Sequence, residues 1–466
     1  MYRFLRVCGR WNQKHPVSGE QALVSVPPNS AMYRSTQAWA FMVLHVLSAA
    51  ASGAPPSAPE ALPDPVAVAS HRIPWSLSDL QSWAERHSPD LGRAAAEVQV
   101  QRGRAWQAGL YPNPEIQGGT NQLNGQQSQY FAMLSQEIVT KHKLQLDQAA
   151  VCREVAQAEL MFVRARFDLL TNVRQAFYLT LSAQRRRDAL QGLIGVARRF
   201  VNAAKSLERG GDGTRGDTLL LELELERADF ALQNSGVALT AAFRQLSATL
   251  GDPELAIHRV GGDLTQSLPD FAYELTQAGL LARNSTIQSA HVEVEKNQVL
   301  LQRATVQPIP NVTVQAGFMY EAMKPHDLAI VQLSLPLPIW NKNQGNIQAA
   351  SANIQRATHA ARKTEVDLTK QLAAVTGRYE VARQQVAKFE SSILPKAKEV
   401  VEITERGFGA GQFDLLRVLQ SQRALIESEL SYVSAQEARW TAAAEIAGLI
   451  QEEQFPPPVS TRLPKE

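Results

Sequence analysis

The chain has 466 residues, with 47 Lys plus Arg against 45 Asp plus Glu and nine His. Nucleic-acid-binding domains carry a concentrated positive charge, so this balance gives no reason to expect nucleic acid as a partner. The histidines are dispersed without metal-site spacing, and we find no nucleophile elbow or catalytic carboxylate motif. The dispersed histidines and the missing catalytic motifs therefore argue against an enzyme, a metal site and a bound cofactor.

The N-terminal part reads as a leader followed by a linker. Arg34 precedes an apolar run from Ala38 to Leu47, and small residues follow the run. This order is typical of a secretory signal, and the run is shorter than the roughly 20 residues of a membrane-spanning helix. We expect residues 1–53 to be a signal peptide or leader, with Met32 as an alternative start, and residues 54–70 to be a Pro- and Ala-rich linker. A buried hydrophobic helix is the alternative for the apolar run.

The rest of the chain is an internal duplication. Residues 111–116 (YPNPEI) recur as residues 307–312 (QPIPNV), and residues 134–138 (LSQEI) recur as residues 333–337 (LSLPL). Each copy predicts a helix, a β-hairpin, a very long helix, a glycine-rich turn and another helix. We assign one repeat to residues 71–260, a second to residues 261–450 and a Pro-rich tail to residues 451–466.

Each repeat contains a long helix with a heptad stripe. No proline lies between Lys141 and Glu208, a length that could reach on the order of 100 Å as a helix. Such stripes predict packing against neighbouring helices, and Pro395 predicts a kink in the second helix. A cytoplasmic coiled coil would explain the stripe by itself, but the strands and the leader argue against it. The stripe positions are Leu160, Val163, Phe167, Leu170, Phe177 and Leu181, with Arg174 at the missing step, and Leu368, Leu372, Val375, Tyr379, Ala382, Val386, Phe389 and Ile393.

Both long helices end in glycine-rich turns. Thr214 and Asp217 resemble a capping pair that starts the helix after the first turn. Glycine at such a turn usually means a chain reversal, and we assign it no nucleotide-binding role. The turn residues are Arg209, Gly210, Gly211, Asp212, Gly213 and Thr214 in the first copy and Arg406, Gly409, Gly411 and Gln412 in the second.

Two hairpins lie between the helices. We predict strands at 115–123 and 128–138, joined through Asn124-Gly125, and at 311–320 and 327–337. Each strand is near the roughly 9–11 residues that cross a bilayer when tilted. Four strands cannot close a barrel, whereas three copies would supply twelve. A small soluble sheet that caps a helical bundle is the alternative. The expected barrel positions are Val312, Val314, Phe318, Val331 and Leu333.

Prolines stand at the expected helix–strand junctions. Neither a helix interior nor a central strand tolerates this residue well, because it lacks the backbone donor. These junction residues are Pro112, Pro114, Pro308, Pro310, Pro336 and Pro338.

These motifs resemble the outer-membrane factor family, the TolC-like efflux proteins, over about residues 71–450. The most specific segments are 333–345 (LSLPLPIWNKNQG) and 409–416 (GAGQFDLL). Residues 110–115 and 134–138 look like the branch that includes CzcC-like and CusC-like heavy-metal efflux channels. One departure is Lys141-His142-Lys143, because this branch usually has a glycine-lysine pair after the glutamine-glutamate strand.

The resemblance implies a mostly α-helical protein with a small β part. Four strands per protomer would contribute to a trimeric, twelve-stranded β-barrel in outer-membrane lipid, and the helices would form a long coiled-coil barrel in the periplasm. Such channels are passive ducts that work with a periplasmic adaptor and an inner-membrane pump, and the turns at 209–214 and 406–412 match the tips where the adaptor docks. Heavy-metal cations are the expected cargo. A periplasmic coiled-coil scaffold and a duct for drugs or secreted polypeptides remain the alternatives.

Overall fold

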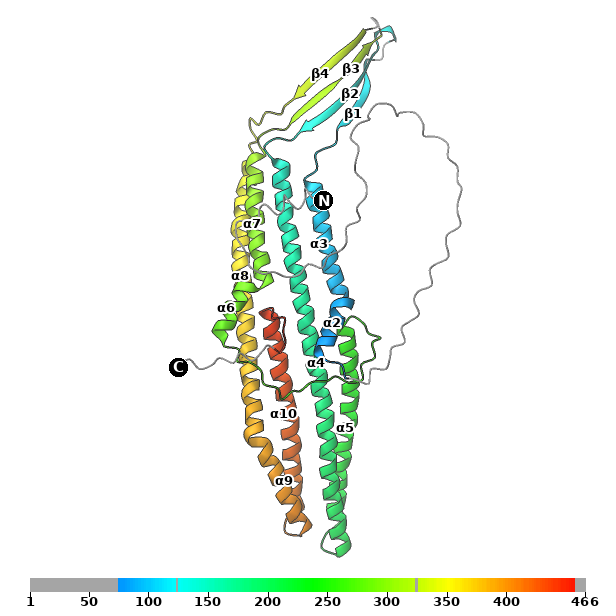
Figure 1. The fold of residues 1–466 in the computed structure, drawn as a ribbon, viewed down its shortest axis with the longest axis vertical. Helices are drawn as coiled ribbons and strands as arrows, with labels where there is room; N and C mark the ends of the chain where they lie inside the picture. Colours follow the sequence, from blue (N-terminus) through cyan, green and yellow to red (C-terminus); the bar gives the residue numbers. More distant parts are fainter. Residues whose placement is uncertain (1–73, 123–124, 323–325, 457–466) are drawn as a thin grey trace, which may run out of the picture. The chain divides into compact units, whose positions relative to one another are not determined.

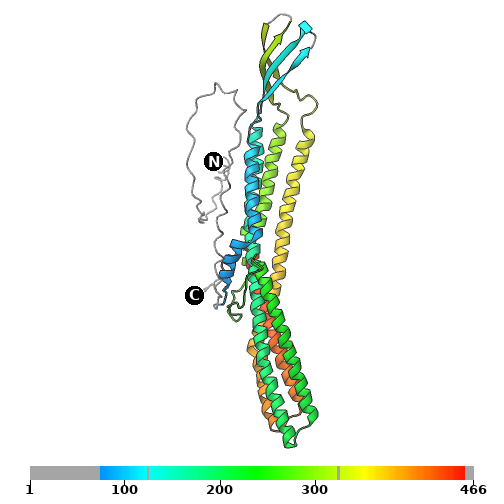
Figure 2. The ribbon, with the colours of Figure 1, turned by 90° about the vertical axis from the view of Figure 1, so that its right-hand side faces the viewer.

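The computed structural model describes residues 74–122, 125–322 and 326–456. The expected leader and linker, and residues 457–466 of the tail, lie outside this part. The described residues belong to one compact unit that begins at Pro74. Its elements are α2 (Leu77–His87), α3 (Pro89–Ala108), β1 (Glu115–Gln122), η2 (Gly125–Gln127), β2 (Gln129–Ile138), α4 (Lys143–Gly210), α5 (Arg215–Thr249), α6 (Tyr273–Arg283), α7 (Ser285–Val306), β3 (Val312–Glu321), β4 (His326–Ser334), α8 (Gln344–Lys388), η3 (Phe389–Ile393), α9 (Leu394–Gly409) and α10 (Leu415–Leu449) (Figures 1 and 2).

The order of elements repeats, as the duplicated motifs predicted. Helices α2 and α3, a hairpin, α4 and α5 are followed by α6 and α7, a second hairpin, α8 with η3 and α9, and α10. Equivalent helices begin in the same way: Ser88 caps α3 as Asn284 caps α7, and Thr214 caps α5 as Asp414 caps α10. In each case the side chain accepts a hydrogen bond from a backbone N–H that the first turn leaves free. The predicted Thr214–Asp217 capping box is present.

Helix α4 runs unbroken over 68 residues, as the absence of proline predicted. It packs against α3 and α7 near its first end and against α5 and α10 farther along (Figure 1). The heptad stripe is wrong at Val163, which is 37% exposed. Near Val163, helices α3 and α7 pack on two sides of α4, and Val163 lies on a side that they do not cover. Of the other stripe residues, Phe167, Leu170, Phe177 and Leu181 are buried, and Leu160 is half-buried.

The second long helix is interrupted next to Pro395, as predicted. Helix α8 ends at Lys388, a π turn follows as η3, and α9 begins with Pro395 in its first turn. Proline has no amide hydrogen to continue the helical ladder, and a π turn closes its hydrogen bonds over one more residue than an α turn. The stripe residues from Leu368 to Val386 are buried, and Phe389 and Ile393 are half-buried.

The strands form one antiparallel sheet in the order β1-β2-β3-β4. The turn between β1 and β2 includes the short helix η2, which begins at Gly125 with a φ of +52°. Asn124, the other half of the predicted turn, lies outside the described residues. Strand β4 ends at Ser334, so the predicted extension to Leu337 is wrong. Pro336 has no backbone N–H and cannot continue the ladder.

A buried arginine replaces an apolar residue in the α4 stripe. The Nη2 atom of Arg174 donates hydrogen bonds to the carbonyls of Glu452 at 3.0 Å and Glu453 at 2.7 Å. Its guanidinium lies 5.0 Å from the centre of the Phe455 ring, and burial lowers the pKa of Arg174 to about 10. Arg174 therefore holds the segment that follows α10 against α4.

Replacing Arg174 with alanine should detach this segment. Two carbonyls would lose hydrogen bonds from a charged donor, which contribute about 1.5–3 kcal/mol, and the volume of the buried side chain would be left empty. We expect a lower thermal unfolding midpoint and faster proteolysis after Leu449. Arg187→Ala is the matched control, because Arg187 is exposed on the same helix. Equal protease resistance of the two variants would contradict this role.

Candidate functional site

The sheet has one apolar face. The register places Ile116, Leu134, Ala316 and Val331 in one row across the four strands. The opposite face is mixed: it carries Gln117, Ser135, Gln315 and Gln332 together with apolar residues such as Met133 and Ile330. Several residues of the apolar face are strongly exposed, at 85% for Ile116 and 78% for Val331, whereas Val312 and Val314 are half-buried. All five expected barrel positions lie on this apolar face: Val312, Val314, Phe318, Val331 and Leu333.

Aromatic residues lie near both ends of the sheet. Tyr130 and Tyr320 pair near the hairpin ends of β2 and β3. Trp340 follows β4 at the other end and is 86% exposed. Tyrosine and tryptophan favour the two interfaces of a bilayer, where an amphipathic ring contacts lipid and water together. In the described helices, by contrast, no segment is both long and apolar enough to cross a membrane.

The sheet is open at both edges. Strand β1 pairs only with β2, and β4 only with β3, in the part of the chain that the structure describes. Each outer edge therefore presents a row of backbone N–H and C=O groups without a strand partner. Such edges pair with other strands or need protection.

The prolines lie where the sheet meets the helices. Pro112 and Pro114 come before β1, and Pro308 and Pro310 come before β3, while Pro336 and Pro338 follow β4. Two of their carbonyls accept hydrogen bonds from β2 and the loop after it. Gln136 Nε2 donates to Pro112 O at 3.1 Å, and Thr140 Oγ1 donates to Pro310 O at 2.8 Å. The junction of the first repeat is thus tied to that of the second.

A buried lysine completes this junction. Lys143 is 3% exposed, and its Nζ donates to the carbonyl of Ile309 and to Asn311 Oδ1. Asn311 in turn donates to Glu137 Oε1 at 2.6 Å. Burial, and then the nearby positive charge of Arg303, lower the pKa of Lys143. In the sequence, Lys143 is the last residue of the Lys141-His142-Lys143 segment that departs from the family pattern. Nothing in the sequence indicated that its side chain is buried.

The segment that departs from the family pattern has a strained backbone. Lys141 and His142 have φ angles of 53° and 55°, in the left-handed region that favours glycine. Both side chains are exposed. The glycine that the resemblance leads us to expect would adopt this conformation without a Cβ penalty.

The glycine-rich turns after α4 and α9 share one backbone design. Gly211 N donates to Glu208 O at 3.2 Å, and Gly411 N donates to Phe408 O at 2.9 Å. The φ angles of Gly211 and Gly411 are +88° and +70°. Gly409, by contrast, ends α9 without a positive φ and has open space where a Cβ would stand. Of these two predicted turn residues, Gly411 takes the left-handed conformation and Gly409 does not.

Two ion pairs link the first turn region to the second. Arg199 on α4 donates to Glu405 on α9 at 2.6 Å, and this hydrogen bond raises the pKa of Arg199. Arg423 on α10 contacts Glu224 on α5 at 2.9 Å. Among the described residues we find no cluster of three or more His, Cys, Asp or Glu that could hold a metal ion.

Replacing Lys141 should change stability according to backbone conformation. Lys141→Gly should raise the thermal unfolding midpoint, because a left-handed residue with a Cβ costs about 1–2 kcal/mol. Lys141→Val should lower it, because a β-branched residue fits this conformation less well than lysine does. The control is Gln145→Gly, an exposed position inside α4, where glycine should destabilise by about 0.5–1 kcal/mol. A lower midpoint for Lys141→Gly would contradict the strain.

Gly411→Val should disrupt the second turn, whereas Gly409→Val should not. A β-branched residue with a left-handed φ costs about 1–3 kcal/mol, but the last residue of a helix accepts one. Limited proteolysis with mapped cleavage sites measures the difference. We expect faster cutting within residues 407–414 in the Gly411 variant, and equal cutting of both variants would refute the assignment.

Comparisons with known proteins agree with this geometry. Residues 278–450 match the family described as Outer membrane efflux protein. The cobalt-zinc-cadmium resistance protein CzcC of Cupriavidus metallidurans is 26% identical over 377 residues, which cover 80% of this chain and 89% of CzcC. The solved structure of CusC aligns with a TM-score of 0.71 at 15% identity, over 80% of this chain and 91% of CusC. That of the outer membrane protein VceC of Vibrio cholerae aligns with a TM-score of 0.67 at 18% identity, over 80% of this chain and 95% of VceC.

The two structural likenesses concern the fold, and the sequence matches concern ancestry. Together with the repeated motifs they confirm the resemblance that the sequence predicted: the chain is similar to the outer-membrane factor, or TolC-like, efflux proteins, with CzcC among its relatives.

Proposed function

We propose that this protein is the outer-membrane channel of a tripartite efflux system. Three copies would join their four-stranded sheets into one twelve-stranded barrel, and their helices would continue it as a periplasmic tunnel. The protein would be a passive duct without catalysis or a bound cofactor. A periplasmic adaptor and an inner-membrane pump would supply energy and select the cargo.

The observation that carries this proposal is the open sheet with one apolar, exposed face. In water such a surface would be an aggregation site. In a bilayer the apolar face contacts lipid, but the unpaired edges become costly because hydrocarbon offers them no hydrogen bonds. A closed ring of strands from several copies satisfies both requirements. Even-numbered barrels of this size are common in outer membranes.

The proposed adaptor contact is at the two turns. Its residues are Arg209, Gly210, Gly211, Asp212, Gly213 and Thr214 on the first turn and Arg406, Gly409, Gly411 and Gln412 on the second. Most of them are exposed, and the left-handed glycines fix the turn that an adaptor would meet. A Gly411→Val variant that still inserts in the membrane should therefore bind the adaptor more weakly than Gly409→Val.

Heavy-metal cations are the cargo that we favour, since the relative CzcC is named for cobalt, zinc and cadmium resistance. A wide, water-filled duct needs no metal-binding cluster to pass such ions. Drugs or secreted polypeptides are the second possibility within the channel reading. A periplasmic scaffold would share the helices but would have no use for the apolar sheet.

Deleting the gene should lower the tolerance of the host to zinc, cobalt or copper and leave tolerance to dyes unchanged. Growth across a concentration series measures this, with the wild-type gene returned on a plasmid as the control. Equal loss of tolerance to dyes and metals would reject metal selectivity. Recovery of the protein as a soluble periplasmic monomer, instead of a membrane-bound oligomer, would reject the channel itself.

A further inference from the structure

Each copy leaves one side of α3 and one side of α8 exposed. Helix α4 lies between α3 and α7, and α7 lies between α4 and α8 (Figure 1). The outer strands β1 and β4 connect to these same two outer helices, α3 and α8. The exposed positions include Asp90, Glu97 and Gln107 on α3, and Asn346, Arg356 and Lys363 on α8.

The contact between α4 and α7 provides a template for what could cover these sides. It continues the antiparallel pairing of β2 with β3, which ends with Ile138 opposite Val312. Polar side chains then meet at regular intervals along the two helices. The pairs are Asp147 with Arg303, Arg153 with Glu295, Glu154 with Lys296, Gln157 with Glu293 and Arg164 with Thr286.

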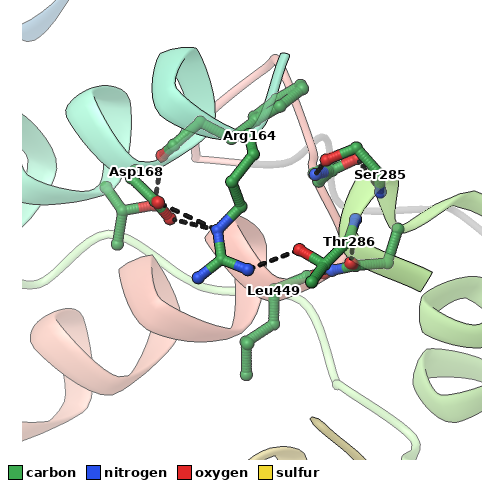
Figure 3. Close-up of polar contacts among 9 residues, drawn as sticks. Arg164, Asp168, Ser285, Thr286 and Leu449 are labelled. Carbon is green, nitrogen blue, oxygen red and sulfur yellow. Dashed lines mark hydrogen bonds and ion pairs between the residues drawn. The ribbon is translucent and has the colours of Figure 1, made fainter. Parts of the chain in front are cut away.

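Figure 3 shows the last pair of this series. Arg164 bonds to Asp168 on its own helix at 2.8 Å and donates from Nη1 to Thr286 Oγ1 at the start of α7. Thr286 lies two residues after Asn284, the N-cap of α7. The contact thus joins the middle of α4 to a helix start.

Helix α3 is the repeat equivalent of α7. Their N-caps, Ser88 and Asn284, are 196 positions apart, and so are Pro112 and Pro308 after the helices. The equivalent of Thr286 is therefore Asp90, and that of Glu293 is Glu97.

Helix α8 is the repeat equivalent of the first part of α4, at an offset of 199. At the turns Gly211 matches Gly411, an offset of 200. The π turn η3 holds one more residue than an α turn, so the offset above it falls to 199. Burial follows this offset, because Ala158, Leu169 and Val173 are buried, and so are their equivalents Ala357, Leu368 and Leu372.

The ion pair of Figure 3 also recurs at this offset. Arg164 pairs with Asp168, and Lys363 pairs with Asp367, in both cases four residues apart on one helix. Lys363 thus repeats the position of Arg164 but has no equivalent of α7 beside it among the described elements.

Resting on the proposed trimer, we propose that α8 of one copy packs against α3 of the next copy as α4 packs against α7. Arg356 then faces the partner subunit's Glu97, as Gln157 faces Glu293. Lys363 faces the partner subunit's Asp90, as Arg164 faces Thr286. The edge of β4 lies beside the edge of the partner's β1 in the same arrangement.

The charges support this pairing. Two polar contacts of the template become pairs of opposite charge, and the side chains of Lys363 and Asp90 are 75% and 82% exposed in one copy. Arg356 and Lys363 are seven residues apart, about two turns, so they lie on one side of α8. The three ion pairs of the template map onto uncharged residues: Gln107 with Asn346, Gln99 with Ala352, and Val100 with Asn353. Of the five template contacts, only the two proposed pairs therefore bring opposite charges together between copies.

Charge reversal tests the pairing. Arg356→Glu and Glu97→Arg should each reduce the fraction of trimer in detergent, because each places like charges together at every interface. The double variant restores opposite charges in all three interfaces and should recover the trimer. Light scattering after gel filtration measures the fraction, and heating measures its stability.

Arg362→Glu is the matched control. Arg362 is exposed and precedes Lys363, but it points roughly 100° around α8, away from the proposed interface. This variant should remain trimeric. As a second measurement, Arg356→Cys combined with Glu97→Cys should form covalent dimers and trimers with a short bismaleimide, and Arg362→Cys combined with Glu97→Cys should not.

A trimeric wild type whose single reversals stay trimeric, or whose double variant fails to recover, would overturn the pairing while the channel proposal stands. A monomeric wild type in detergent would overturn the channel proposal and the pairing with it. Cross-linking through Arg362→Cys, in place of Arg356→Cys, would show that a different side of α8 lies at the interface. It would refute the offset of 199 between α4 and α8.

Discussion

The outer edges of β1 and β4 set the strongest constraint on this molecule. A strand in water can leave its free N–H and C=O groups to solvent, but a strand in hydrocarbon must have them paired. The apolar row through Ile116, Leu134, Ala316 and Val331 favours contact with lipid. In a single copy, however, the unpaired edges make insertion into lipid unfavourable. Pairing of edges between copies would remove the conflict. Because β1 follows α3 and β4 precedes α8, closing the sheet would also bring these helices of adjacent copies together.

Because of the duplication, the same kind of strand and helix packing can occur within a copy and between copies. Within a copy, β2 with α4 lies against β3 with α7, held by the Lys143 junction and by a series of ion pairs. Between copies, β4 with α8 would lie against β1 with α3. The second contact has fewer charges than the first.

The sequence was sufficient for features that depend on local chemistry. The missing prolines predicted α4, Pro395 predicted the break after α8, and the Thr214–Asp217 pair predicted the start of α5. Alternation predicted the second hairpin better than the first, whose strands contain Gly118 and several amides. The end of β4 was misjudged because alternation continues past Ser334 in the sequence, while the hydrogen bonds do not.

Features that depend on distant partners could not be predicted. Arg174 interrupts the apolar heptad stripe, and the sequence does not indicate its partners. These are the carbonyls of Glu452 and Glu453, 278 and 279 residues away. Lys143 was noted only as part of a departure from the family pattern, yet it is buried and donates to carbonyl and amide oxygens of the other repeat. The difference between Gly409 and Gly411 was also hidden, because a G-x-G spacing does not say which residue takes the positive φ.

The two turns show how a repeat can keep its backbone and change its surface. Asp212 N donates to Leu207 O, and Gln412 N donates to Gly407 O, at 3.0 and 2.8 Å. The side chains that fill each turn are exchanged. In the first turn Leu207 packs over Gly213, where a Cβ would lie 3.0 Å from that of Leu207. In the second, Phe413 fills the space beside Gly407, and a Cβ on Gly407 would collide with its ring.

Each turn therefore keeps one large apolar side chain beside a glycine, but the two positions are exchanged between the repeats. This exchange also makes the outer surfaces different. The first turn presents Asp212, whereas the second presents Gln412 beside Phe413, whose ring lies 4.6 Å from the guanidinium carbon of Arg417. A trimer would then end in two chemically distinct kinds of turn that alternate around its rim. An adaptor that docks there would have to recognise the shared backbone of Gly211 and Gly411, or else distinguish the two repeats by charge and by the aromatic ring.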